Sequence, residues 1–167
     1  MNLSARFLLD YETLFVNHDL ITEFSDTLLM IPYSSFKLFN QMITETLNSN
    51  EFSDEDKKLT KKYFKPFIDL VYSNETVLQQ IIRDNAEKSS AICIDTVNKI
   101  FMCFVNVEDK AIDLGVNPDI LSTFDKYDLD VLKSSKYFDC PIFTTSEGIK
   151  DTIVTNNIQV DYVFGTR

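Results

Sequence analysis

The sequence predicts an α/β fold, a three-layer sandwich in which helices flank a mainly parallel central sheet. Short apolar runs alternate along the chain with segments whose apolar residues recur at helical spacing, and this alternation is typical of strands connected by helices. Within the runs at 7–9 and 28–31 the apolar residues are consecutive, as in strands covered on both faces. A chain of 167 residues with 44% hydrophobic residues can bury one substantial core. We therefore expect a single domain over residues 1–167.

The first half of the chain predicts two strands followed by a series of helices. Pro32 should end the second strand because proline cannot donate to a sheet. Ser34 and Ser53 are residues of the kind that cap helices, and Pro66 should kink or divide the helix that Ser53 begins. The elements predicted here are strands at 6–10 and 27–31, and helices over 14–23 and beginning near 34, 54 and 74.

The second half predicts a hairpin and then two further strands separated by helices. The apolar runs at 91–94 and 100–105 flank a short polar turn, as in a hairpin. Pro118 suits the first turn of a helix, Asp128 should begin another helix, and Ser146 should cap the last one. The remaining strands are expected at 141–145 and 158–164.

Charge excludes one broad class of function. The chain has 26 acidic and 16 basic residues, a net charge of −10, and this excess of negative charge opposes a large surface for duplex DNA. Clustered carboxylates are, by contrast, how proteins bind hard cations such as Mg²⁺ and Mn²⁺. The composition therefore leaves room for a metal-dependent site.

The cysteines and the apolar segments indicate the cellular compartment in which we expect the protein. Cys93, Cys103 and Cys140 lie within apolar runs without metal-binding spacing, which favours free thiols in a reducing compartment. The first nine residues do not resemble a secretory signal, and no apolar run approaches the ~20 residues that span a bilayer. We expect a cytoplasmic protein without a membrane segment.

Several polar residues follow predicted strands, where ligands bind in open α/β sheets. Asp10 ends the first strand, and Ser146 and Glu147 follow a late strand. Asp128 opens the helix that leads into that late strand. Because the carboxyl ends of parallel strands meet at one edge of the sheet, these residues can converge there.

At this point the sequence resembles the PIN-domain family of metal-dependent ribonucleases. Four segments carry the resemblance, in the order in which the family has them: FLLDYETL (7–14), IPYSSF (31–36), DLDVLKSS (128–135) and CPIFTTSE (140–147). The resemblance implies a sheet flanked by helices, and acidic residues that hold Mg²⁺ or Mn²⁺ to activate water against a phosphodiester of single-stranded RNA.

The resemblance also implies roles for individual residues. Asp10 and Asp128 match two of the family's acids and would be the catalytic residues that hold the metal, with Glu147 assisting. Leu38 or Phe39 stands where the family has a glutamate, and Ser146 replaces its last acid. An activity that depends on this acidic set is therefore in question.

Other interpretations of the same residues remain open. The scaffold can be a non-catalytic module that binds a protein or RNA partner, and Asp128 can simply cap its helix. Asp10 with Glu12 also resembles the opening motif of haloacid-dehalogenase-like phosphatases, with Asp10 as nucleophile, although Glu replaces the usual Asp. Asp125 and Asp130 are expected to be solvated.

One basic concentration stands out on this acidic chain. Its five lysines, predicted to lie on the helix beginning near residue 54, are Lys57, Lys58, Lys61, Lys62 and Lys65. They form either a solvated face or a patch that contacts RNA or an acidic partner. Ser146 is, besides an expected helix cap, a further candidate for such a contact.

Overall fold

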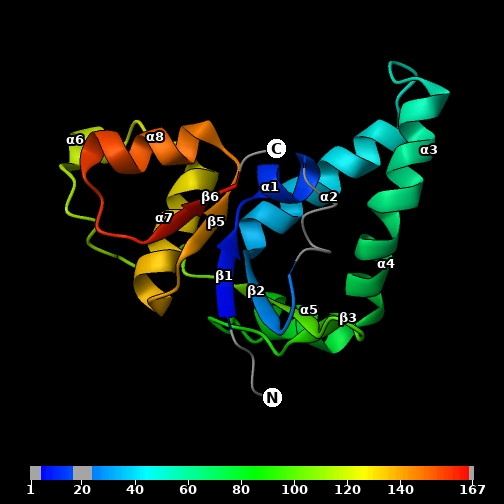
Figure 1. Ribbon diagram of the computed structural model, residues 1–167, viewed down its shortest axis with the longest axis horizontal. Helices are drawn as coiled ribbons and strands as arrows, with labels where there is room; N and C mark the ends of the chain where they lie inside the picture. The colour runs from blue at the N-terminus through cyan, green and yellow to red at the C-terminus, as the bar shows by residue number, and fades with distance from the viewer. Residues whose placement is uncertain (1–4, 17–23, 166–167) are drawn as a thin grey trace.

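The structure, a computed structural model, describes residues 5–16 and 24–165. Within these residues it has six strands and eight helices (Figure 1). The strands are β1 (Ala5–Leu9), β2 (Thr27–Pro32), β3 (Ile92–Asp95), β4 (Ile100–Val105), β5 (Ile142–Thr144) and β6 (Tyr162–Phe164). The helices are α1 (Tyr11–Val16), α2 (Tyr33–Asn48), α3 (Asp54–Tyr63), α4 (Lys65–Ser73), α5 (Glu75–Ile82), α6 (Pro118–Leu121), α7 (Lys126–Phe138) and α8 (Glu147–Asn156).

The strands form one six-stranded sheet in the order β3-β4-β2-β1-β5-β6. All neighbouring strands are parallel except β3, which pairs antiparallel with β4. In β1, Leu8 is in register with Met30 of β2 on one side and with Ile142 of β5 on the other. The chain runs from β1 towards β4 and later returns to the other side of β1, so the switch point of the sheet lies beside this strand. The predicted mainly parallel sheet is confirmed.

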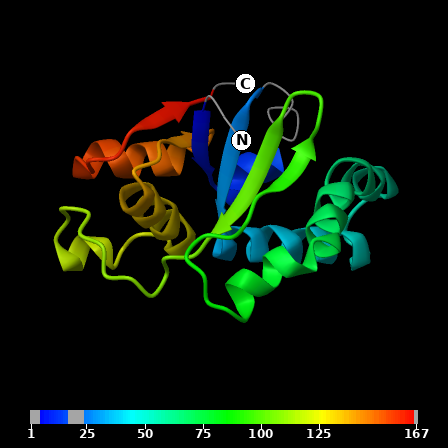
Figure 2. The same ribbon diagram turned by 90° about the horizontal axis from the view of Figure 1, so that it is seen from below.

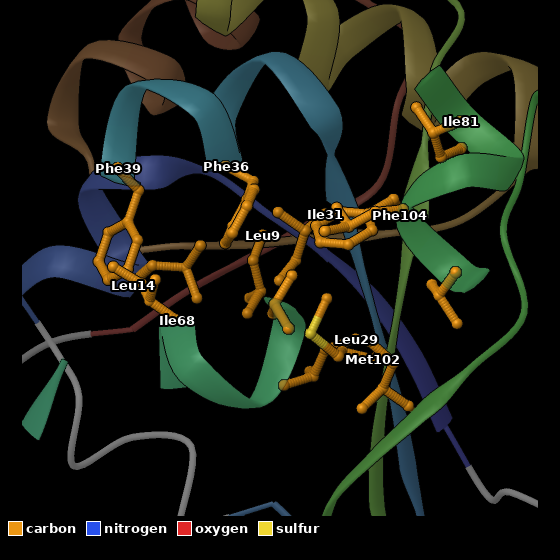
Figure 3. Packing of buried hydrophobic residues seen from close by; sticks show 14 of the residues in the cluster. Leu9, Leu14, Leu29, Ile31, Phe36, Phe39, Ile68, Ile81, Met102 and Phe104 are labelled. Atoms are coloured by element: carbon orange, nitrogen blue, oxygen red, sulfur yellow. The ribbon is translucent and has the colours of Figure 1, made fainter. Parts of the chain in front are cut away.

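Alternate residues of the strands face two separate hydrophobic cores. On one face, Leu9, Leu29 and Phe104 pack against α1, α2, α4 and α5, and Figure 3 shows how closely these side chains gather. On the other face, Leu8 and Met30 pack against α7 and α8. Figure 2 shows the two helical layers on either side of the sheet. Burial on both faces explains why the apolar residues of these strands are consecutive in the sequence.

Several local predictions are confirmed. The hairpin forms between β3 and β4, and Ser53 caps α3 by accepting a hydrogen bond from the Asp56 N–H at 3.1 Å. Pro66 lies in the first turn of α4, so the predicted division falls between α3 and α4. Lys65 consequently belongs to α4 rather than to α3.

Two helix starts differ from the prediction. Ser34 does not cap α2, because β2 runs through Pro32 directly into a helix that begins at Tyr33. Asp128 does not begin α7 either; the N-cap is Asp125, whose carboxylate accepts hydrogen bonds from two backbone N–H groups of the first turn. In both cases the helix begins before the polar residue that we expected to start it.

The last strand and the first helix also have different bounds in the structure from those that the sequence predicted. The last strand is confined to β6, whereas the sequence indicated a strand over 158–164. The first helix begins at Tyr11, and residues 17–23 of the predicted helix over 14–23 lie outside the described residues. In the part of the chain that the structure describes, none of the helices has the length and apolar character needed to cross a bilayer.

Candidate functional site

Asp10 lies at the carboxyl end of β1, at the switch point of the sheet. Its carboxylate accepts a hydrogen bond from the Thr13 backbone N–H at 3.2 Å and another from the Thr13 hydroxyl. Its backbone carbonyl accepts the Leu14 N–H at 3.3 Å, so Asp10 caps the start of α1. Only 2% of its surface is exposed. The carboxylate is thus held in one orientation by the chain itself.

Thr13 connects the ends of β1 and β5. Besides donating to Asp10, its hydroxyl oxygen accepts a hydrogen bond from the Thr145 backbone N–H at 3.0 Å. Burial raises the pKa of Asp10, while hydrogen bonds from Thr13 and Thr144 act in the opposite direction. The two threonines therefore favour the ionised form of the Asp10 carboxyl group, whereas its burial favours the protonated form.

Asp128 lies in the first turn of α7 and faces the same edge of the sheet. Burial first, and then the charges of Asp125, Asp10 and Glu12, raise its pKa to about 6. The charge of Asp10 acts on Asp128, so the two residues lie in the same region of the molecule. The sequence prediction that Asp10 and Asp128 converge is consistent with this coupling, although they come from distant parts of the chain.

Tyr11 and Tyr127 flank the two acids, one directly after Asp10 and the other directly before Asp128. Their ring centroids are 5.8 Å apart with the planes at 69°. Burial raises the pKa of the Tyr11 hydroxyl, and the charges of the surrounding carboxylates raise it further. Sequence reasoning did not single out this pair, because nothing in either segment alone indicates that the rings meet.

Ser146 and Glu147 are placed differently from the two aspartates. The Ser146 hydroxyl accepts the Ile149 N–H at 3.3 Å, so its predicted role as the cap of α8 is confirmed. Glu147 is exposed in the first turn of the same helix, where its charge complements the helix dipole. Glu147 is thus the least enclosed of the predicted acids.

Asp125 is exposed as expected, whereas the burial of Asp130 corrects the expectation that it is solvated. Asp125 is exposed but caps α7 through hydrogen bonds from the Tyr127 and Asp128 N–H groups at 2.9 and 3.2 Å. Asp130 is only 7% exposed and accepts a hydrogen bond from the Ser34 hydroxyl at 2.5 Å. Burial raises the pKa of Asp130, and the bond from Ser34 opposes this. Asp130 shares a helical face with Ser134, four residues later, which is also buried.

The family resemblance predicts a glutamate at Leu38 or Phe39. Neither residue has a carboxylate. Phe39 is 1% exposed and belongs to the hydrophobic core beneath α2, and Leu38 is partly buried. Among the residues that the structure describes, no three His, Cys, Asp or Glu side chains are grouped so as to hold a metal ion. Glu147 therefore does not complete a three-acid set with Asp10 and Asp128.

The residues present fit a divalent ion of one kind. Mg²⁺ in proteins is commonly bound by one or two carboxylates and keeps several of its waters. Asp10 and Asp128 provide two carboxylates at an edge where negative charges repel one another, and a cation would relieve that repulsion. The chemistry suits a hydrated, weakly held ion and not an ion enclosed by protein ligands.

The predicted lysine patch lies on another part of the molecule. Lys58, Lys61 and Lys62 are exposed on α3, and both views place this helix away from β1 and β5, beyond α2 (Figures 1 and 2). Lys57 is partly buried. Lys65 forms an ion pair with Asp69 on α4, with Nζ to Oδ2 at 2.9 Å. The patch is therefore not part of the acidic edge.

Comparison with known proteins adds no family assignment. No protein-family model matches the sequence, and the search of curated proteins gives no match. What can be said about function therefore depends on the geometry of this chain.

Proposed function

We propose that this chain is a PIN-like domain that binds Mg²⁺ or Mn²⁺ at Asp10 and Asp128 and hydrolyses phosphodiester bonds of single-stranded RNA. The observation that carries the proposal is the position of the buried Asp10 at the carboxyl end of β1, beside the switch point of the sheet, with Asp128 among the groups whose pKa the Asp10 charge raises. Ligand sites of open α/β sheets lie at this edge, beside the switch point. Strongly perturbed carboxyl groups in such a place favour a functional role.

The two aspartates would have different roles. Asp10 is held by Thr13 and would be the fixed ligand. Asp128 is only partly buried, and with its pKa raised to about 6 it exists in both protonation states near neutral pH. When bound, the ion would lower the pKa of an attacking water and stabilise charge on the phosphoryl oxygens.

The proposal is tested by cleavage of a fluorescent single-stranded RNA. Asp10→Asn keeps the shape of the side chain but removes the anion, so cleavage in Mg²⁺ or Mn²⁺ should collapse, as it should in excess EDTA. Asp84→Asn is the matched control, because Asp84 is exposed in the turn after α5, far along the chain from the site. Undiminished cleavage by purified Asp10→Asn protein would show that the activity has another origin.

A second candidate is a non-catalytic interaction module that binds a protein or RNA partner. The observation in its favour is that the acids are incomplete: Phe39 lies in the core, Ser146 caps a helix, and the described residues hold no three-acid group. Fewer anionic ligands weaken a divalent-cation site. In this case RNA cleavage is absent in every metal, and the exposed lysines of α3 are the surface to test.

A further inference from the structure

Two lysine–aromatic pairs lie on elements that end or begin near the carboxyl edge of the sheet. The Lys126 Nζ lies 4.9 Å from the centroid of the Tyr127 ring. The Lys150 Nζ lies 4.5 Å from the centroid of the Phe164 ring. Tyr127 directly precedes Asp128, and Phe164 is the last residue of β6.

The spacing along the edge follows from the sheet. β6 is the second strand from β1, with β5 between them. Since neighbouring strands are about 4.8 Å apart, Phe164 ends its strand about 10 Å from the end of β1. Tyr127 packs edge to face on Tyr11, which follows Asp10 directly.

These rings are not ordinary core residues. Tyr11, Tyr127 and Phe164 are all partly exposed, and none belongs to either hydrophobic core. Tyr33 shows the contrast: it follows β2 and lies under Lys37, but its ring packs against the core residue Phe104 at 5.9 Å. Core packing therefore accounts for Tyr33 and leaves the other three rings unexplained.

From this geometry we infer that the Lys126–Tyr127 and Lys150–Phe164 pairs bind successive parts of a single RNA strand that runs along the carboxyl edge of the sheet. The inference rests on the proposed function and specifies how the substrate is held. Rings stack on unpaired bases, and lysines neutralise the neighbouring phosphates. A duplex does not present its base faces, so this edge selects single strands.

The inference assigns RNA contact to other lysines than the patch on α3. Lys126 begins α7, two residues before Asp128, and Lys150 lies in the first half of α8, the helix that follows β5, whereas α3 is placed beyond α2 (Figure 1). Because Asp10, Glu12, Asp125 and Asp128 would repel phosphates, binding at this edge should require a divalent cation in solution.

The test measures binding of a fluorescein-labelled oligouridylate of about 12 nucleotides by anisotropy in Mg²⁺. Tyr127→Leu and Phe164→Leu remove a ring but keep apolar volume, and Tyr127→Phe keeps the ring. Tyr137→Leu is the matched control: Tyr137 lies at the other end of α7, and Lys110 is 5.4 Å from its ring centroid. Anisotropy is read directly after mixing and cleavage on a gel afterwards, so the two readouts are independent.

The inference expects each leucine variant at the edge to weaken binding roughly 5- to 150-fold. Tyr127→Phe and Tyr137→Leu should bind like the wild type. Lys126→Gln and Lys150→Gln, which leave the rings in place, should each reduce the slope of log affinity against log salt by about 0.7.

Several results would overturn the inference: a wild type that does not bind the single strand, edge variants that bind normally, an equal loss in Tyr137→Leu, or equally tight binding of a duplex. Its failure is distinct from that of the proposed function. Normal cleavage together with normal binding by the edge variants overturns only the inference. Weakened binding by those variants, with no cleavage by the wild type, overturns only the proposed function.

Discussion

Replacing Asp128 by asparagine should stabilise the folded protein at neutral pH. Burial and the charges of Asp125, Asp10 and Glu12 raise the Asp128 pKa from 3.8 to about 6. A difference of about two pKa units corresponds to at most about 3 kcal/mol. Because the side chain is partly exposed and its charge favours the first turn of α7, screening and the lost dipole interaction reduce this to about 1–2 kcal/mol.

The pH dependence of this gain follows from the direction of the pKa change. The folded protein holds the Asp128 proton more tightly than the unfolded chain, so ionisation costs stability as the pH rises from about 4 to about 6. Below this window both states are protonated and the cost is absent. Asp128→Asn should therefore match the wild type near pH 4 and exceed it at neutral pH, where the melting temperature should rise by about 2–8 °C.

The assay is thermal and urea unfolding of both proteins across this pH range, with and without Mg²⁺. Added Mg²⁺ should raise the wild-type melting temperature more than that of the variant, since a ligand stabilises the state that binds it. A gain in stability that is the same near pH 4 and near pH 7, or a loss at neutral pH, would refute the electrostatic reasoning.

Three further predictions concern other contacts. Thr13→Val removes the hydroxyl that joins Asp10 to the Thr145 N–H; we expect a loss of about 1–3 kcal/mol in the free energy of unfolding, and an unchanged urea midpoint would contradict this. Ser34→Ala removes the donor to the buried Asp130 and should cost a similar ~1–3 kcal/mol at neutral pH, with Ser90→Ala, at an exposed position, as the surface control. Reversing Lys58 and Lys62 to Glu on exposed α3 should leave stability within about 0.5 kcal/mol. If the interaction module is correct, this reversal should slow association with an acidic partner most strongly at low salt, whereas equal association rates would identify a solvated face.

Much of the fold could be predicted because burial on both faces leaves a simple trace in the sequence. Consecutive apolar residues marked β1 and β2, and the turn between two apolar runs marked the β3–β4 hairpin. Helix starts were harder to predict, since several polar residues near each start can cap it. At α7, Asp125 and Asp128 were both suitable, and only the course of the preceding chain decides between them.

The candidate site was predictable in part for a similar reason. The rule that parallel strands end at one edge predicted that Asp10 and Asp128 lie in the same region, and the charge of Asp10 does act on the pKa of Asp128. It could not reveal the pairing of Tyr11 with Tyr127, or the bond from Ser34 to Asp130, because these depend on how α1 and α2 pack against α7. Contacts between distant helices have no signature within either helix.

The most direct test of the central claim is a crystal of the wild-type protein soaked in Mn²⁺ and measured for anomalous scattering. The account predicts a peak bonded to carboxylate oxygens of both Asp10 and Asp128, and no such peak in Asp10→Asn crystals treated in the same way. An anomalous map without a peak at this edge, or with an ion bound to Glu147 and neither aspartate, would contradict it.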